Sequence, residues 1–300
     1  MALAMACLPV SGIAAEAPVT MAVTVDDLPV HGPLPPGVTR SDVARQVTAD
    51  FKAAGLPPVY GFINGKGLDD EGADAAQALA IWRGAGNPLG NHTFAHDDPN
   101  KQPLAAFEAA VAANEPILKK YMGDADWHWL RFPFLNSGAT PERRAQAGAY
   151  LAAHGYHVAE VTLGTEDYNY NAPYVRCLAK GDKDAVATLR QTYLQRLAQA
   201  FERSRLQSQA VFGRQVPQVL LLHIGVIETQ VLPDTLAYLK AQGVTFAPLA
   251  QVEADPAYAY PPDSPETGNS NLLDRAVTAH HVTSPPPLPD IAAWLDGLCR

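Results

Sequence analysis

The sequence predicts an α/β protein: a parallel sheet of about seven strands, either open or closed into a slightly incomplete (β/α) barrel, with a proline-rich C-terminal tail. Apolar strand-like segments alternate with helical segments along most of the 300 residues, which is the order expected for a parallel sheet. Residues 218–225 form a continuous apolar run, as buried parallel strands do. Polar residues of unusual kinds follow directly after strands: Asp26, Asp27, Arg131, Asp167 and His223. Folds of this class carry their active sites at that edge of the sheet.

The individual elements follow from the order of apolar and polar residues. The first strand is predicted at residues 21–25, and Ser41 is a suitable N-cap for a helix that runs through Phe51 and stops at Gly55. Further helices are predicted at residues 73–86, 104–121, 141–155, 183–207 and 232–243. Further strands are predicted at residues 59–65, 127–132, 156–163, 218–225 and 244–249.

The chain divides into three predicted parts. Residues 1–17 are a run of small and apolar residues ending in an A-x-A pattern, which we interpret as a clipped signal peptide although no Lys or Arg precedes Arg40. Residues 18–253 form the barrel, and residues 254–300 form a proline-rich extension that packs on it. A signal peptide predicts a periplasmic or secreted protein. There Cys177 and Cys299 could form a disulfide, although two unrelated thiols fit the sequence equally well.

Composition excludes several classes of partner. The formal net charge of −9 is not offset by any basic stretch, so we expect no binding of nucleic acid or of anionic membrane surfaces. The apolar run at the start is too short to span a bilayer, and no stable membrane insertion is expected. The sequence contains neither a P-loop nor a G-x-S-x-G motif, and it does not predict an oligomeric state.

The stretch GNHTFAH contains two candidate metal ligands. His92 and His96 are four residues apart, so on a helical turn both imidazoles would face one direction. This spacing suits two ligands of one zinc ion. Taken alone, the pair is explained better by a chance occurrence or by structural histidines. A carboxylate from another strand end would complete a set of two His and one Asp, which is common at catalytic zinc sites and leaves a position open for water.

The doublet Asp26-Asp27 at the end of the first strand offers such a carboxylate. Adjacent side chains of a strand point to opposite faces, so the two cannot both enter one core. A metal site needs one carboxylate as a ligand and a different one as a base. Asp27 on the metal and Asp26 beside the bound water would meet both needs, although either residue taken singly could lie in a solvated turn.

Five stretches occur in this order along the chain: TVDD, GNHTFAH, RFPF, TEDYNYN and LLLHIG. Together they resemble the five motifs of the polysaccharide deacetylases, the NodB-homology fold of carbohydrate esterase family four. The resemblance extends over about residues 20–250 and implies a distorted (β/α) barrel with a catalytic site. It departs from the family pattern at Val25, Phe134, Tyr168 and Ile224, so that it predicts the reaction more firmly than the substrate.

The resemblance implies a role for each matching residue. The metal ligands would be Asp27, His92 and His96, and the metal would be Zn²⁺, with Co²⁺, Ni²⁺ or Mn²⁺ as alternatives. Asp26 would be the general base, and Arg131 would orient it through a charge-assisted contact. His223 would be the general acid, with its pKa raised by Asp167.

Three further residues would contact the substrate. The backbone N–H of Phe134 would stabilise the oxyanion, Leu221 would line the pocket for the acetyl methyl group, and Tyr168 stands where many members have Trp. Two alternatives remain at this stage: Glu166 could take the place of Asp167, and His223 could be a satisfied core histidine.

The function implied is a metal-dependent hydrolase that removes N-acetyl groups from an acetylated carbohydrate. Removal of O-acetyl groups, for example from acetylated xylan, would use the same residues. An amidase acting on a small non-sugar amide and a non-catalytic carbohydrate-binding barrel are the other hypotheses. A closed groove would favour a small substrate and a long open groove a polymer.

Overall fold

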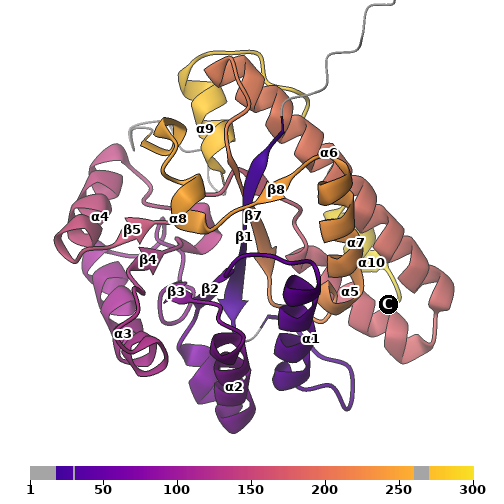
Figure 1. Ribbon diagram of the computed structural model, residues 1–300. Helices are drawn as coiled ribbons and strands as arrows, with labels where there is room; N and C mark the ends of the chain where they lie inside the picture. The colour runs from indigo at the N-terminus through magenta and orange to yellow at the C-terminus, as the bar shows by residue number, and fades with distance from the viewer. Residues whose placement is uncertain (1–17, 30, 260–269) are drawn as a thin grey trace, which may run out of the picture.

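A computed structural model describes residues 18–29, 31–259 and 270–300 of the protein. The strands within these residues pair only in parallel and form one strongly curled sheet (Figure 1). The strands are β1 (Thr20–Leu28), β2 (Tyr60–Ile63), β3 (Leu89–Asn91), β4 (Trp129–Leu130), β5 (His157–Val158), β6 (Leu163–Gly164), β7 (Gln218–His223) and β8 (Thr245–Phe246). The predicted distorted (β/α) barrel is confirmed. The predicted signal peptide, residues 1–17, lies outside the described residues.

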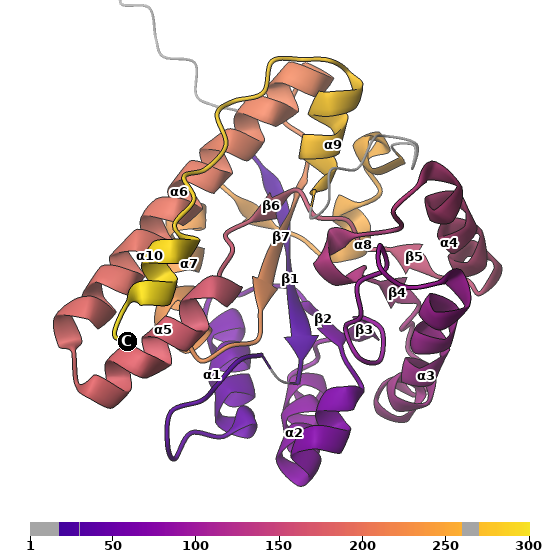
Figure 2. The same ribbon diagram turned by 180° about the vertical axis from the view of Figure 1, so that it is seen from behind.

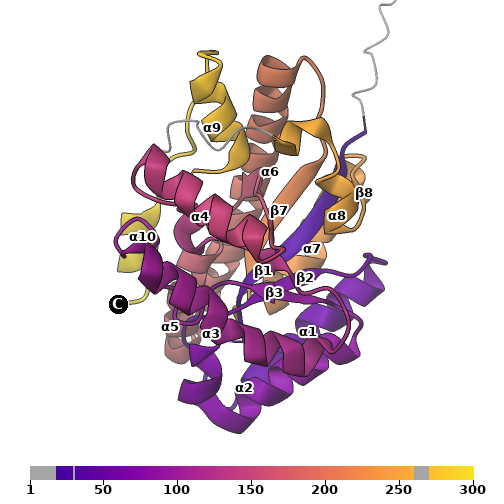
Figure 3. The same cartoon turned by 90° about the vertical axis from the view of Figure 1, so that its left-hand side faces the viewer.

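The order of strands leaves the barrel open on one side. The sheet runs β5-β4-β3-β2-β1-β7-β6, and β8 pairs with the beginning of β1. Figure 3 shows β1 and β7 side by side at the centre, with α3 and α4 on the side nearer the viewer. Since the two ends of the sheet, β5 and β6, do not pair with each other, a gap separates them.

The gap corrects one prediction. Residues 156–163 were expected to form a single strand, but they form parts of β5 and β6 on opposite sides of the gap. The N–H of Ala159 still bonds to the carbonyl of Leu130 on one side, whereas the N–H of Thr162 bonds to Val219 on the other. The chain therefore crosses the gap within a few residues. Tyr156, Ala159, Val161 and Leu163 are buried, which explains why the segment has the apolar pattern of one continuous strand.

Helices surround the outer face of the sheet (Figures 1 and 2). They are α1 (Arg40–Ala53), α2 (Lys66–Gly84), α3 (Leu104–Met122), α4 (Pro141–Ala153), α5 (Tyr168–Lys180), α6 (Lys183–Phe212), α7 (Glu228–Ala241), α8 (Leu249–Val252), α9 (Leu272–Ala279) and α10 (Ala292–Gly297), with single 3-10 turns at Pro133–Leu135 and Pro256–Ala259. The sequence did not predict α5. Thr39, not Ser41, caps α1, because its hydroxyl accepts from the N–H of Asp42. Of the helices described, none is long and apolar enough to cross a membrane.

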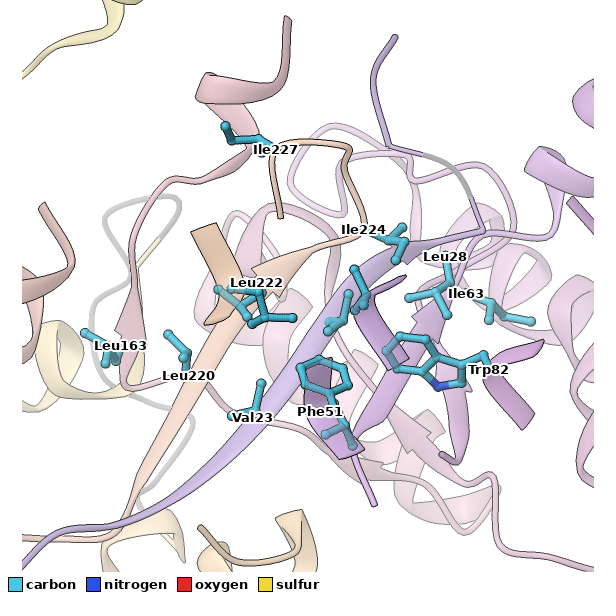
Figure 4. Close-up of a cluster of buried hydrophobic side chains, with 14 of the residues drawn as sticks. Val23, Leu28, Phe51, Ile63, Trp82, Leu163, Leu220, Leu222, Ile224 and Ile227 are labelled. Atoms are coloured by element: carbon cyan, nitrogen blue, oxygen red, sulfur yellow. The ribbon is translucent and has the colours of Figure 1, made fainter. Parts of the chain in front are cut away.

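Side chains alternate along β1, so that some face the apolar core and others face the barrel interior, where the polar groups lie. Val23 is buried and points away from the barrel axis, toward the helices (Figure 4). Leu222 of β7, Phe51 of α1 and Trp82 of α2 belong to the same apolar cluster, and the rings of Phe51 and Trp82 meet edge to face with centroids 5.9 Å apart. Burying side chains of this size contributes about 1.5–3 kcal/mol each. Thr24 and Asp26 of β1 face the barrel interior instead, where Arg131 contacts both side chains.

The C-terminal extension lies along α5 and α6 (Figure 2). Arg203 of α6 pairs with Asp274 of α9 at 2.7 Å, and Arg176 of α5 donates to the carbonyl of Leu295 in α10 at 3.0 Å. A disulfide joins Cys177 of α5 to Cys299. The extension is thus attached to the same two helices that follow β6 in the chain.

Candidate active site

The candidate site lies at the carboxyl ends of β1, β3, β4 and β7, where the sequence predicted it. Asp26 and His223 are direct neighbours in the register of β1 and β7. The N–H of Ile224 donates to the carbonyl of Asp26, which fixes the two strand ends relative to each other. The proposed base and acid are therefore carried by adjacent, hydrogen-bonded strands in the middle of the sheet.

The Asp26-Asp27 doublet is turned by an irregularity in β1. The register of β1 with β2 shifts between Val25 and Leu28, and Asp27 has a left-handed backbone with φ of 64°. In a regular strand the two carboxylates would point to opposite faces. Here both reach His92, whose Nε2 lies 3.7 Å from Asp26 Oδ2 and 3.4 Å from Asp27 Oδ1. Bulges of this kind redirect side chains, and non-glycine residues with positive φ gather at functional sites.

Three of the predicted residues converge as a possible metal centre. Asp27, His92 and His96 each offer a ligand atom, and these atoms all lie within 4.8 Å of one another. Asp27 Oδ1 is 3.4 Å from His92 Nε2 and 3.5 Å from His96 Nε2. The predicted helical turn is wrong, however. Residues 92–96 form a loop, in which Thr93 and His96 have φ of 61° and 57°.

Two buried asparagines hold this loop in place of helical hydrogen bonds. The Oδ1 of Asn91 accepts from the N–H of Thr93 at 2.9 Å and from Asn114 Nδ2 at 3.0 Å. Asn114 also donates to the carbonyls of Ile63 and Thr93. The sequence gave no sign of Asn114, which lies in the middle of α3.

The chemistry of the three donors fits a divalent cation. His92 Nδ1 lies 2.7 Å from the carbonyl of Arg131, which can only accept, so the proton is on Nδ1 and Nε2 carries a lone pair. Metal-binding histidines are commonly oriented in this way. Asp27 Oδ1 is buried and has no hydrogen-bond partner among the described residues. Acceptor atoms that face one another, with no proton between them, are the arrangement that a bound cation would satisfy.

The pKa values favour the deprotonated forms that metal ligands need. Burial alone would raise the pKa of Asp27, but the hydrogen bond from His31 and the positive charge of His223 hold it well below its usual range. Burial and the neighbouring His92 lower the pKa of His96 to about 4. At neutral pH, Asp27 is therefore a carboxylate and His96 is a neutral imidazole.

Arg131 binds the proposed base inside the barrel. Its Nη1 lies 3.3 Å from each carboxylate oxygen of Asp26, and both side chains are almost fully buried. Its other nitrogens donate to the carbonyl of Ala159 at 2.8 Å and to the hydroxyl of Thr24 at 3.1 Å. With the guanidinium held on several sides, the carboxylate of Asp26 has a fixed direction.

His223 and Asp167 form the predicted pair. Asp167 accepts from His223 Nδ1 at 2.9 Å with one oxygen, and from the backbone N–H of His223 at 2.6 Å with the other. Burial alone would lower the pKa of His223, but the negative charge of Asp167, with smaller contributions from Asp27 and Asp26, raises it to about 9. Glu166, the alternative partner, pairs instead with Arg196. His223 is therefore a cation at neutral pH, held by Nδ1 and with Nε2 left to the site.

The predicted substrate contacts surround these groups. Phe134 is 48% exposed, and its ring centroid lies 4.5 Å from that of His96. Tyr168 is 36% exposed, with its ring 5.1 Å from that of His223. Leu221 and His223 line a cavity of about 250 Å³, whose far wall comes from α6 and the C-terminal extension. One exposed aromatic ring therefore lies beside a proposed metal ligand, and the other lies beside the proposed acid.

One residue near the centre was missed by sequence reasoning. His31 Nδ1 lies 2.8 Å from Asp27 Oδ2, and its ring centroid is 5.3 Å from that of His223. Its segment belongs to neither a helix nor a strand, so no periodicity marks it. Asn171 of α5 donates to the carbonyls of His31 and Pro33 and was missed for the same reason as α5 itself.

Comparisons with known proteins agree with the fold. Residues 15–159 match the family model described as polysaccharide deacetylase. No curated protein sequence matches the chain significantly. Somewhat less than half of the chain is therefore similar to the polysaccharide deacetylase family, and its fold is that of solved deacetylases.

Solved structures share the fold at low sequence identity. The chitin deacetylase of the fungal pathogen Colletotrichum lindemuthianum is 22% identical over 78% of this chain and 87% of its own, with a TM-score of 0.52. A carbohydrate esterase family 4 domain of a xylanase from the hindgut metagenome of Trinervitermes trinervoides is 16% identical over 86% of this chain and 100% of its own, with a TM-score of 0.53.

A family 4 pseudoenzyme from Bacillus anthracis is also similar. It is 12% identical over 78% of this chain, with a TM-score of 0.53. The match covers 65% of that longer protein, so this chain spans about two thirds of its length.

Proposed function

We propose that this protein is a metal-dependent hydrolase that removes N-acetyl groups from an acetylated carbohydrate. The observation that carries the proposal is the convergence of Asp27, His92 and His96 beside two supported side chains, Asp26 and His223. The first three residues have the composition of a catalytic zinc site. Asp26 is suited to act as the base and His223 as the acid. Zn²⁺ is the expected ion.

A divalent cation bound by these ligands would supply Lewis acidity and make a nearby water molecule more acidic. The side chains would move the protons. Asp26, held by Arg131, accepts the proton that the attacking water loses as its oxygen bonds to the acetyl carbon. His223, a cation at neutral pH, donates its Nε2 proton to the amide nitrogen as the C–N bond breaks. The products are acetate and the free amine of the sugar.

The alternative of a non-catalytic barrel arises because one solved structure with this fold is a pseudoenzyme. In this chain, a protein without catalytic function would have no need to keep both Asp26 and His223 in specific ion pairs. Arg131 contacts both oxygens of Asp26, and Asp167 contacts His223 through two bonds. These specific contacts favour a catalytic role for Asp26 as the base and for His223 as the acid.

The cavity beside His223 supports a small acetylated substrate. Its volume of about 250 Å³ is below the range of about 300–1,000 Å³ that takes drug-sized ligands. Asn271, Asp274, Pro287 and Leu288 of the extension close its far side. We therefore propose an acetylated sugar or short oligosaccharide as substrate. An O-acetylated xylan would meet the same base and acid, and is the alternative to test.

We further propose that the protein works in an oxidising compartment, the periplasm or the exterior of the cell. The support is the disulfide between Cys177 and Cys299, since such bridges persist outside the reducing cytosol. Thiol titration of the denatured, unreduced protein tests this. Neither Cys177 nor Cys299 should react.

The first test is bound metal together with acetate release. Purified wild type should hold about one zinc per chain and release acetate from acetylated chito-oligosaccharides. Asp27→Ala should lose both. Asp26→Asn should keep the metal but lose activity by on the order of a hundredfold or more, because the proton acceptor is gone. Asp124→Asn, at an exposed position on the loop before β4, is the matched control and should keep both.

Acetylxylan and peptidoglycan fragments, assayed in parallel, identify the substrate class. If acetate were released from acetylxylan alone, the proposed activity would be O-deacetylation and not N-deacetylation. Bound zinc with no acetate from any of these substrates would move the proposal to a small non-sugar amide. Wild type that holds no metal after zinc is supplied would refute the proposed function.

A further inference from the structure

The two carboxylate oxygens of the proposed ligand Asp27 have different surroundings, because only one of them contacts His31. Oδ2 lies 2.8 Å from His31 Nδ1. Oδ1 faces the Nε2 atoms of His92 and His96 and, within the described residues, has no hydrogen-bond partner. A carboxylate can accept about four hydrogen bonds, and a buried one is normally satisfied on both oxygens. The bond to His31 therefore satisfies one oxygen and leaves the other for a ligand position.

The segment that carries His31 is itself held in place. The buried Arg40 of α1 donates to the carbonyl of Gly32 at 2.8 Å, and its guanidinium also pairs with Glu71 at 2.7 Å. Asn171 donates from α5 to the carbonyl of Pro33 at 3.0 Å.

Gly32 has φ of 64°, and a Cβ at this position would lie 2.5 Å from the Nδ2 of Asn171. The segment therefore fits closely between α1 and α5. A side chain on so constrained a segment can hold its partner in one orientation, which a flexible loop could not do.

We propose that His31 is a positioning residue for the metal centre: its Nδ1–H holds Asp27 Oδ2, so that Oδ1 is presented beside His92 and His96. This inference rests on the proposed metal-dependent function. Without the bond, the carboxylate of Asp27 could rotate and offer either oxygen. Partners that orient metal ligands typically change metal affinity by about 10–100-fold when they are removed.

A merely structural role for His31 makes a different prediction. If the bond served only to satisfy a buried carboxylate, its loss would change stability and leave the metal affinity of the folded protein unchanged. Activity would not separate the two roles, because the ring of His31 also lies near that of the proposed acid His223. Metal binding, measured without substrate, does separate them.

The experiment compares zinc affinity, by competition with a chromogenic chelator, in wild type and three His31 variants. His31→Ala should bind zinc about 10–100-fold more weakly. His31→Asn should recover most of the affinity, since its Nδ2 can take the place of Nδ1, whereas His31→Gln, whose amide lies farther out, should not. His154→Ala removes an exposed histidine at the end of α4 and should have no effect.

The visible absorption spectrum of bound Co²⁺ provides the second readout, since it reports ligand geometry. It should change in His31→Ala and return in His31→Asn. If His31→Ala does not fold, the comparison of His31→Asn with His31→Gln carries the test. Equal affinity and equal spectra in wild type and the variants would overturn the inference and leave the proposed function standing. No metal binding by wild type would overturn the proposed function, and the inference with it.

Discussion

Three histidines of the site have Nδ1 within hydrogen-bond distance of a partner. His92 is held by the carbonyl of Arg131, His223 by Asp167 and His31 by Asp27. The partner determines the chemistry of each ring. A neutral carbonyl leaves His92 as a donor of a lone pair, whereas the carboxylate of Asp167 makes His223 a cation. The same side chain thus serves as a ligand in one place and as an acid in the other.

The charge of His223 leads to a measurable prediction. In the metal-free protein, an NMR titration should show His223 protonated up to about pH 9, because Asp167 and the other two carboxylates outweigh the effect of burial. Asp167→Asn should lower this pKa, since the largest favourable charge is removed. Glu166→Gln is the control: Glu166 pairs with Arg196, and its loss should leave the titration unchanged. A His223 pKa that stays the same in Asp167→Asn would contradict this assignment.

At the scale of single residues, the sequence predicted which residues form the site better than it predicted their geometry. The Asp26-Asp27 doublet and the two histidines of GNHTFAH were recognisable because unusual polar residues followed strands. The left-handed backbone of Asp27 could not be predicted, since aspartate adopts it only where surrounding contacts require it. His31 could not be predicted either, because its role depends on a contact and not on a repeating pattern.

At the scale of elements, the predictions failed where a segment contacts more than one neighbour. Residues 156–163 have the alternation of one strand, but they pair with β4 at one end and with β7 at the other. The helix α5 was missed because TEDYNYNAPYVRC contains Asn, Pro and three Tyr, which favour helix weakly. Its buried face packs on α6 through residues such as Tyr170, whose ring meets that of Tyr193 edge to face. Tertiary packing therefore outweighs local propensity here.

The disulfide between α5 and the C-terminal extension should contribute to stability. Cys177 and Cys299 are separated by 122 positions, and closing a loop of this size restricts the unfolded chain strongly. Replacing both by serine should lower the free energy of unfolding by about 2–5 kcal/mol, measured by urea denaturation. A reducing agent should reproduce the loss in wild type and have no effect on the double variant. Equal unfolding curves for all samples would show that the bridge is energetically neutral.

At the scale of the whole molecule, buried ionisable groups make stability depend on pH. Burial, and then Asp167, raises the pKa of Glu228 well above its usual range, and burial followed by Glu160 does the same for Glu253. His223 is raised to about 9. Each group binds a proton more tightly in the folded state. Its contribution is therefore complete below its unfolded pKa and is lost as pH rises toward the folded value.

The metal-free protein should thus lose stability between about pH 7 and pH 9. His96, with its pKa lowered to about 4, is neutral throughout this window and does not oppose the trend. Glu228→Gln cannot release a proton, so its stability relative to wild type should increase with pH. Urea denaturation at several pH values in the presence of a chelator measures this. A constant difference between the variant and wild type would mean that Glu228 does not titrate abnormally.

The central position of β1 has a consequence for how the chain is made. Its neighbour β7 comes far later, as the bond from Thr24 to the carbonyl of Leu220, 196 positions away, shows. During synthesis the proposed ligands Asp27, His92 and His96 all emerge early, whereas the acid His223 arrives only with β7. A nascent chain would hold the parts of a metal centre while one edge of β1 is still unpaired, and exposed edges invite aggregation. Early protection of that edge is then a requirement of biosynthesis, separate from any requirement of the reaction.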